Sequence, residues 1–338
     1  MPPLPRSALE LACRMPKAEL HVHIEGTLEP DLAFTLARRN GLQLPFADEA
    51  ALQAAKNFTD LQSFLDLYYA CADVLRTEQD FADLMEAYLA RAHADGVVHA
   101  EIFFDPQTHT ARGVPMASVM AGLTAGQRAG ARRFGVKTRL ILCFLRHLSE
   151  DDAFATLRET EPYLANIDGF GLDSAERDHP PHKFVRVFER VRSLGKPVVA
   201  HAGEEGPAAY ITEALDLLGA VRIDHGVRAV EDPALMARLA RDRVALTVCP
   251  LSNVRLRVFP ELAQHTLPAL IAAGIPVTIN SDDPAYFGGY MNDNIRALQA
   301  AFHWDREIWA RLGHNSIEAS WADPADKVRW HAEIDALL

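Results

Sequence analysis

The sequence predicts an α/β protein folded as one (β/α)8 TIM barrel over residues 1–338, with extra helices after the first strand and at the C-terminus. Eight short apolar segments alternate with segments of helical periodicity, the order expected for parallel strands joined by covering helices. Polar residues follow several of the apolar segments, at the strand ends where barrel active sites form. Barrels of this length commonly form one domain. Residues 1–15 are predicted to form an irregular N-terminal segment.

The first half of the barrel is predicted from four apolar segments, at 18–22, 97–104, 137–145 and 167–172. Before the second of them, apolar side chains recur three and four residues apart, at Phe81, Leu84, Met85, Tyr88 and Leu89. This spacing gives a helix one apolar stripe that can pack against the sheet. A covering helix is therefore predicted ahead of the second strand.

An insertion over residues 42–75 separates the first predicted strand from the second. It contains further helical spacing, and its position after a strand predicts that it lies at the mouth of the barrel. Phe58, Phe64 and Tyr68 could stack on a planar ligand there, but their spacing favours packing within helices.

The second half of the barrel is predicted from segments at 197–200, 221–224, 245–249 and 276–280. The helical pattern before the first of these ends at Gly195, a residue typical of helix C-termini. The tail over residues 294–338 carries further helical patterns. Its four tryptophans are predicted to pack in the interior: Trp304, Trp309, Trp321 and Trp330.

The composition restricts the classes of partner. The formal net charge of −12 opposes binding to nucleic acid or to an anionic membrane surface, and favours a neutral or cationic small molecule. No stretch approaches the roughly 20 apolar residues of a membrane span, and the first residues lack the apolar run of a signal peptide. The four cysteines are dispersed without a CxxC pair, which indicates reduced thiols. We therefore expect a cytoplasmic protein.

Polar residues with metal-binding or proton-transfer chemistry follow four of the predicted strands. They are His21 and His23 after the first, His201 and Glu204 after the fifth, His225 after the sixth, and Asp282 and Asp283 after the eighth. Residues two apart on a strand point to the same side, so His21 and His23 can offer two imidazoles together. The carboxyl ends of barrel strands meet at one face. The sequence therefore predicts a metal site there, suited to a borderline ion such as zinc.

Five separated motifs resemble the adenosine and adenine deaminase family of the metallo-dependent hydrolase superfamily. They are ELHVHIEGTL at 19–28, HAGE at 201–204, DHG at 224–226, CPLSN at 249–253 and SDDP at 281–284. The resemblance implies a hydrolytic deaminase with one zinc ion per chain, for which iron(II) or cobalt(II) could substitute. It assigns the metal to His21, His23, His201 and Asp282. It also implies that Glu204 is the proton donor, that His225 acts on the attacking water and that Asp283 contacts the base.

The choice of purine is predicted from departures within the first motif. Adenosine deaminases of this family carry Asp in His-x-His-x-Asp-Gly, where it serves the ribose, whereas this chain has Glu25. The longer side chain could exclude the sugar and bind the ring N–H that glycosylation removes. Segments 101–113, 169–181 and 282–290 also resemble the adenine deaminase branch, and Ser174 is predicted to lie near the base. We therefore predict deamination of adenine to hypoxanthine and ammonia in purine salvage.

Two alternatives remain open at this point. One is a deaminase of adenosine or of N6-substituted adenine nucleosides or nucleotides, for which Arg112, Arg146 or Lys183 could bind a phosphate. The other is a metal-binding interaction protein without catalysis. Such a protein would need neither the acid Glu204 nor the imidazole His225, which favours the enzyme. His109, His179 and His182 lie in loops near the second and fourth strands and could contact a substrate, while Ser252 and Asn253 are predicted to organise the loop after the seventh.

Overall fold

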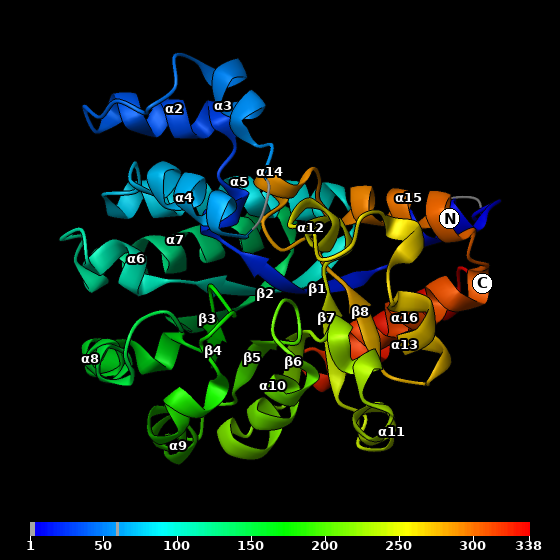
Figure 1. The fold of residues 1–338 in the computed structure, drawn as a ribbon. Helices are drawn as coiled ribbons and strands as arrows, with labels where there is room; N and C mark the ends of the chain where they lie inside the picture. The colour runs from blue at the N-terminus through cyan, green and yellow to red at the C-terminus, as the bar shows by residue number, and fades with distance from the viewer. Residues whose placement is uncertain (1–3, 59–60) are drawn as a thin grey trace.

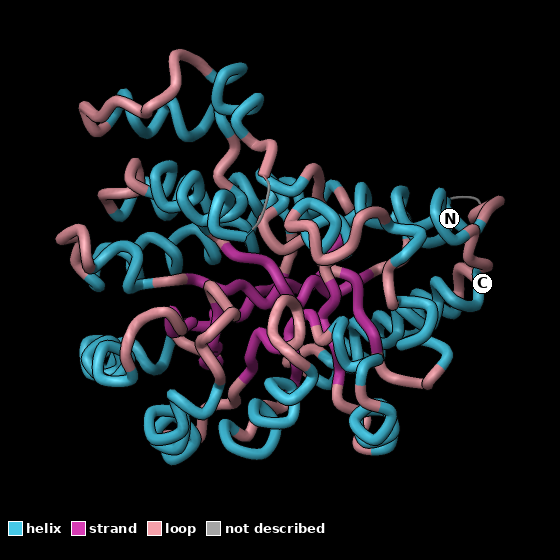
Figure 2. The backbone as a smooth tube through the Cα atoms, viewed as in Figure 1, coloured by secondary structure: helices cyan, strands magenta, loops and turns pink. Residues whose placement is uncertain are grey.

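Eight parallel strands form the centre of the molecule in the computed structural model, which describes residues 4–58 and 61–338. Their bounds are β1 (Lys17–His23), β2 (Val97–Phe104), β3 (Lys137–Leu145), β4 (Gly169–Asp173), β5 (Val199–Ala202), β6 (Arg222–His225), β7 (Ala245–Val248) and β8 (Val277–Ile279). They pair in chain order as two four-stranded sheets, β1 to β4 and β5 to β8. Helices ring these strands (Figures 1 and 2).

Two parallel bridges join the sheets into a closed barrel: Phe170 with Val198, and Val22 with Asp282. At the second bridge, the backbone N–H of His23 donates to the carbonyl of Asp282 at 3.0 Å, and the N–H of Asp282 donates to the carbonyl of His21 at 3.1 Å. Closure gives every strand two neighbours and removes the sheet edges. The predicted (β/α)8 barrel is confirmed.

The covering helices pack closely on the barrel and on one another. Gly122 lies where α7 (Met116–Phe134) meets α5 (Glu78–Ala94), and a Cβ there would come 2.6 Å from Phe81 Cβ. The helices between β3 and β8 are α8 (Glu150–Thr160), α9 (Val185–Ser193), α10 (Ala208–Glu213), α11 (Pro233–Arg241), α12 (Pro250–Arg255) and α13 (Leu267–Ala272). Short 3₁₀ or π turns are η1 (Glu25–Thr27), η2 (Glu161–Asn166), η3 (Pro181–Phe184), η4 (Ala214–Leu218), η5 (Val227–Glu231) and η6 (Leu262–Gln264).

The extra helices after β1 begin earlier than the sequence predicts. The helix α2 (Pro30–Arg39) starts at a proline, which suits the first turn of a helix, and precedes α3 (Glu49–Ala55) and α4 (Leu61–Ala72). In Figure 1, α2 and α3 stand at the top of the view, away from the strands, whereas α4 lies nearer the barrel. A further helix, α6 (Pro106–Thr110), follows β2 directly.

The N-terminal segment corrects one prediction. Residues 1–15 are predicted to be irregular, but they contain the helix α1 (Ala8–Arg14). Ser7 caps this helix, since its side chain accepts the backbone N–H of Glu10 at 3.1 Å. The pattern Ser7-x-x-Glu10 is a known start of a helix, so the sequence did contain the indication. The helix packs against the C-terminal helices (Figure 1).

The C-terminal region is helical, as predicted, and comprises α14 (Pro284–Phe287), α15 (Met291–Phe302), α16 (Arg306–Ala319) and α17 (Pro324–Asp335). Trp304, Trp309 and Trp330 are buried. Trp321 is partly buried, and the guanidinium of Arg222 lies 5.1 Å from the centre of its ring. The four tryptophans therefore contribute packing.

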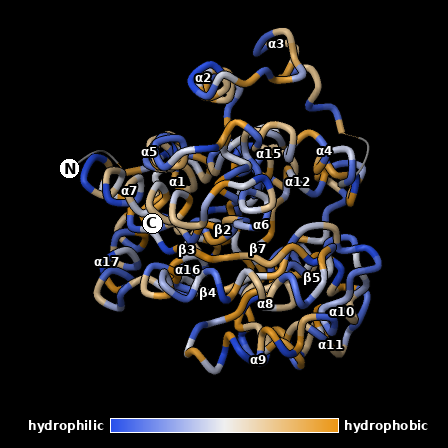
Figure 3. Tube along the Cα trace, turned by 90° about the vertical axis from the view of Figure 1, so that its left-hand side faces the viewer, coloured by the Kyte–Doolittle hydropathy of each residue, from blue (hydrophilic) through white to orange (hydrophobic). Residues whose placement is uncertain are grey.

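Apolar residues gather along the central strands, while the outer loops are mainly polar (Figure 3). Cys71, Cys143 and Cys249 are buried and Cys13 is partly buried, and all four are free thiols. Among the described residues, no helix has both the length and the apolar character needed to cross a bilayer.

Candidate metal centre and active site

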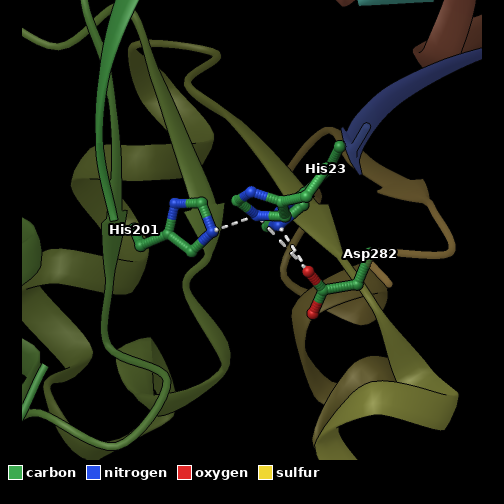
Figure 4. A group of neighbouring side chains, drawn as sticks. His23, His201 and Asp282 are labelled. Atoms are coloured by element: carbon green, nitrogen blue, oxygen red, sulfur yellow. Dashed lines mark hydrogen bonds and ion pairs between the residues drawn. The ribbon is translucent and has the colours of Figure 1, made fainter. Parts of the chain in front are cut away.

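Four side chains that the sequence assigns to a metal converge at the carboxyl ends of the strands. His21 and His23 come from the end of β1, His201 from β5, and Asp282 from the segment after β8. All four are buried, and one ligand atom of each lies within 4.8 Å of the others. The Nε2 atoms of His23 and His201 are 3.2 Å apart. Asp282 Oδ1 lies 3.3 Å from His21 Nε2 and 3.5 Å from His23 Nε2 (Figure 4).

Nδ1 of His21, the ring nitrogen on the side away from the cluster, is held by a directed chain of hydrogen bonds. Thr247 Oγ1 donates its single hydrogen to Asp224 Oδ1 at 2.8 Å, and the same oxygen lies 3.0 Å from His21 Nδ1. Because the hydroxyl has no second hydrogen, Nδ1–H of His21 donates to it. With a hydrogen on Nδ1, Nε2 is the nitrogen that can offer a lone pair to the cluster, as a metal ligand must.

The other two imidazoles have carboxylates beside their outer nitrogens. Asp173 Oδ2 lies 3.5 Å from His23 Nδ1, and Asp224 Oδ2 lies 3.6 Å from His201 Nδ1. Carboxylates in this position favour the tautomer that leaves Nε2 free for a metal.

The donor set fits a borderline divalent ion. Three imidazoles and one carboxylate are ligands that zinc accepts, and the buried His21 Nε2 has no hydrogen-bond partner. Burial lowers the pKa of His23 to about 4. Burial and the neighbouring imidazoles also hold the pKa of His201 well below its usual range. Neutral imidazoles are the form that a metal requires.

The backbone at the site is unusual at three positions. Ser174, His225 and Asp282 have φ angles of 72°, 63° and 64°, in the left-handed region that non-glycine residues seldom adopt. Such conformations cost about 1–3 kcal/mol each and persist where the surroundings enforce them. At Asp282 the enforcing contacts are the two backbone bonds to β1. The preceding Ser281 is also fixed, because its N–H donates to Glu19 Oε1 at 3.2 Å.

Glu204 and His225 lie beside the metal cluster as a buried pair. Their closest atoms, Glu204 Oε2 and His225 Nε2, are 3.5 Å apart, and His225 Nε2 lies 3.8 Å from Asp282 Oδ2. Burial, reinforced by the charge of Asp282, raises the pKa of Glu204 well above its usual range. Burial lowers the pKa of His225 to about 3. Burial therefore favours the protonated carboxyl of Glu204 beside the neutral imidazole of His225.

Asp283 packs directly against the backbone at Gly26. A Cβ at Gly26 would come 2.6 Å from both Cβ and Cγ of Asp283, so only glycine leaves room for this carboxyl. Asp283 Oδ1 is buried without a hydrogen-bond partner. Burial and the adjacent Asp282 raise the pKa of Asp283 well above its usual range. The protonated carboxyl can donate a hydrogen bond to a ligand atom.

Exchanging Gly26→Ala is expected to lower kcat/KM about 10- to 100-fold, because displacement of Asp283 by about 1 Å misplaces the substrate. Steady-state kinetics with adenine, the substrate that the sequence resemblance implies, measure the effect. Gly41→Ala is the control, since its added Cβ meets nothing within 4 Å but its φ of +64° disfavours alanine. The control should lose about 1–2 kcal/mol of unfolding free energy and keep its kinetics. Unchanged kinetics in Gly26→Ala would contradict the assignment of Asp283.

Of the other predicted substrate contacts, Ser174 reaches the cavity and Glu25 does not. Ser174 lines the cavity, and its hydroxyl lies 2.9 Å from His147 Nδ1 and 3.3 Å from the hydroxyl of Tyr69. Glu25 Oε1 instead accepts from His109 Nε2 at 2.7 Å and from the backbone N–H of Asp105 at 3.2 Å. Burial opposes ionisation of Glu25, but the contact with His109 lowers its pKa.

Three of the candidate ligands, His23, His201 and Asp282, line a cavity at the barrel mouth. Its lining comprises His23, Phe64, Leu65, Tyr68, Tyr69, Asp105, Asp173, Ser174, His201, Glu204, His225, Leu256, Asp282 and Asp283. Phe64 and Tyr68 are buried, as predicted for packing residues, and they also form part of this wall.

Two lining carboxyls were missed by the sequence analysis. Asp105 follows β2 and Asp173 ends β4, and together with His23 they form a second buried group with ligand atoms within 4.8 Å of one another. Both residues occupy the strand-end position that identified the other candidates. The same rule, applied to strands two and four, would have found them.

The cations that could have bound a phosphate lie elsewhere. Arg112, Arg146 and Lys183 are not among the described residues that line the cavity. Arg146 donates to the carbonyl of His201 at 2.6 Å, and Lys183 donates to the carbonyl of Arg146 at 3.0 Å. Arg112 donates to His109 Nδ1 at 2.7 Å. All three side chains are therefore held by hydrogen bonds within the protein.

The mouth of this closed parallel barrel combines a cluster of potential metal ligands with a buried acid. These features define the protein as a barrel enzyme with a metal-competent centre. A sequence profile of the adenosine deaminase family matches residues 16–337. The chain therefore belongs to the adenosine deaminase family, which confirms the predicted resemblance.

Its relatives include proteins described as adenine deaminases. The protein of Trichlorobacter lovleyi is 58% identical over 98% of this chain and 96% of its own length. That of Streptomyces coelicolor is 59% identical over 95% of each chain. The crystal structure of adenine deaminase from Arthrobacter aurescens superposes with a TM-score of 0.94 at 52% identity, covering 95% of this chain and 98% of that one. An amidohydrolase from Burkholderia ambifaria with bound Zn gives a TM-score of 0.89 at 29% identity, covering 99% and 94%.

Proposed function

We propose that this chain is a zinc-dependent adenine deaminase that converts adenine and water to hypoxanthine and ammonia. The observation that carries the proposal is the convergence of His21, His23, His201 and Asp282 beside the buried acid Glu204. Relatives described as adenine deaminases, 56% to 60% identical over most of the chain, support the substrate. We also propose that this reaction serves purine salvage in the cytoplasm.

Hydrolytic deamination needs a water nucleophile at C6 of the purine and a proton at N1, where electrons accumulate. A divalent ion in the cluster would supply the first requirement by lowering the pKa of a bound water towards 7. Glu204, protonated because it is buried, donates its proton to N1. The protonated Asp283 donates a hydrogen bond to N7 and fixes the ring orientation. His225 orients the attacking water, and ammonia leaves as the C6–N bond breaks.

The cavity wall suits the free base better than a nucleoside. Asp105 and Asp173 face the cavity with acidic side chains, and each has one buried oxygen without a hydrogen-bond partner. Free adenine carries an N9–H that such an oxygen can accept, and glycosylation removes this hydrogen. Sites built around a polar contact reject analogues that lack it by about 10⁴- to 10⁵-fold. These two residues, rather than Glu25, are the carboxyls available for this contact.

A substrate panel on protein loaded with one zinc ion per chain tests the proposal. Adenine is expected to exceed adenosine, AMP and N6-methyl-AMP in kcat/KM by about 10⁴-fold, for the reason given above. Ammonia release and the absorbance change from adenine to hypoxanthine measure the rates. A preference for adenosine would sink the substrate assignment. Metal binding without ammonia release from any member of the panel would favour the non-catalytic alternative.

A further inference from the structure

Asn253 lies between the two groups that handle protons at the active site. It is buried on α12, after β7. Its amide nitrogen Nδ2 is 3.2 Å from Glu204 Oε1 and 3.2 Å from His225 Nδ1. Its amide oxygen Oδ1 is 3.2 Å from Nε2 of the buried His265. One amide therefore contacts Glu204, His225 and His265.

The backbone fixes the direction of this chain of hydrogen bonds. The N–H of Leu267 lies 3.0 Å from His265 Nδ1, and a backbone N–H can only donate. Nδ1 of the neutral His265 is therefore an acceptor, so its proton is on Nε2. Burial supports the neutral form, because it lowers the pKa of His265 to about 3. Nε2–H then donates to Asn253 Oδ1, which turns the amide NH₂ toward the active site.

The NH₂ group in turn determines where its two partners carry hydrogen. It has no acceptor capacity, so His225 Nδ1 must accept from it, and the proton of the neutral His225 is on Nε2. Nε2 is the nitrogen that lies 3.5 Å from Glu204 Oε2. The second hydrogen of the NH₂ group goes to Glu204 Oε1. This leaves Oε2 as the oxygen of Glu204 that is free to carry a proton.

We propose that His265 and Asn253 are positioning residues that hold His225 as an Nε2–H donor and hold Glu204 with its proton on Oε2. The proposal rests on the proposed function for the roles of Glu204 and His225. Its consequence is that His225 donates a hydrogen bond to the attacking water and does not take a proton from it. The residues that set this arrangement lie outside the cavity wall, on α12 and at the start of the segment leading into α13.

Two exchanges at His265 separate hydrogen bonding from packing. His265→Leu keeps the volume but removes both ring nitrogens, so the Asn253 amide is free to rotate. Its kcat for adenine is expected to fall about 10- to 100-fold, the usual effect of losing an outer-shell partner, with little change in KM or zinc content. His265→Gln offers a carbonyl to the Leu267 N–H and an NH₂ to Asn253, and should recover most of kcat. The control is His93→Leu, on an exposed histidine of α5.

The position of the His225 proton can be measured without substrate. In ¹⁵N-histidine-labelled, zinc-loaded protein, long-range ¹H–¹⁵N correlation distinguishes the two tautomers, and His225→Gln identifies the resonance. We expect the Nε2–H form in the natural protein and in His265→Gln, and an altered tautomer population in His265→Leu. An Nδ1–H tautomer in the natural protein, or unchanged kcat and tautomer in His265→Leu, would overturn the proposal. Failure to deaminate adenine would instead overturn the proposed function, since the spectra do not depend on turnover.

Discussion

Exchanging Glu204→Gln is expected to lower kcat for adenine about 10²- to 10⁴-fold, the usual contribution of a general acid. Glutamine keeps the size of the side chain and can still accept from Asn253 Nδ2, which lies 3.2 Å from Glu204 Oε1. It cannot release a proton to N1. Steady-state kinetics with adenine measure the loss, and metal analysis with urea unfolding checks that the site remains intact. Retention of more than about a tenth of kcat would show that the proton comes from another group.

The pH dependence gives a second measure of the same residue. In the proposed mechanism the acid form of Glu204 is the active form, and burial raises its pKa above the usual range of a carboxyl. kcat/KM should therefore be maintained below this elevated pKa and fall as the pH rises through it. Glu204→Gln should lack this decline, because its side chain does not titrate. If the decline persists unchanged in the variant, it belongs to a different group.

Exchanging His201→Ala is expected to reduce zinc affinity by more than the roughly 10- to 100-fold that loss of an outer-shell partner causes. Activity with adenine should then fall below detection at stoichiometric zinc. The reason is that one of four converging donors is lost while Asp282 and two imidazoles remain buried without it. Metal analysis after dialysis and kinetics with added zinc measure the two effects.

A matched outer-shell variant calibrates this result. Thr247→Val removes the hydroxyl that lies 3.0 Å from His21 Nδ1 while preserving shape, so it should cost only about 10- to 100-fold in affinity or activity. Zinc should raise the Tm of the natural protein, because a ligand that binds only the folded state stabilises it. It should raise the Tm of His201→Ala much less. Equal zinc content in His201→Ala and the natural protein would contradict the proposed ligand set.

The parts of the fold and site that the sequence predicted are those set by local pattern. Alternating apolar and helical segments predicted eight strands, and the rule that strand ends meet at one face brought His21, His201 and Asp282 together. Asp173 directly follows the fourth predicted segment, which ends at residue 172, so the same rule applies to it, but it lies in none of the five motifs. Asp105 directly follows β2, but it is not a histidine and it lies outside the five motifs that resemble the family.

Other features of the site depend on contacts that no local pattern encodes. The position of Glu25 depends on the turn η1, which directs its carboxylate to His109 on α6. That contact joins residues 84 positions apart in the chain. The contacts of Asn253 with Glu204 and His225 likewise join residues 49 and 28 positions apart in the chain. The capped helix α1 is a different case, because its cap was readable from Ser7 and Glu10.

The bridge between β1 and Asp282 has a consequence for biosynthesis. The residue that completes the donor cluster also hydrogen-bonds through its backbone to His21 and His23, so ring closure and ligand assembly are one event. During translation the three imidazoles emerge from the ribosome well before Asp282 does. A nascent chain therefore offers only the three imidazoles, and the four-donor set forms only after the last strand has docked. Truncation before residue 282 should yield a polypeptide that neither closes its barrel nor retains a metal ion.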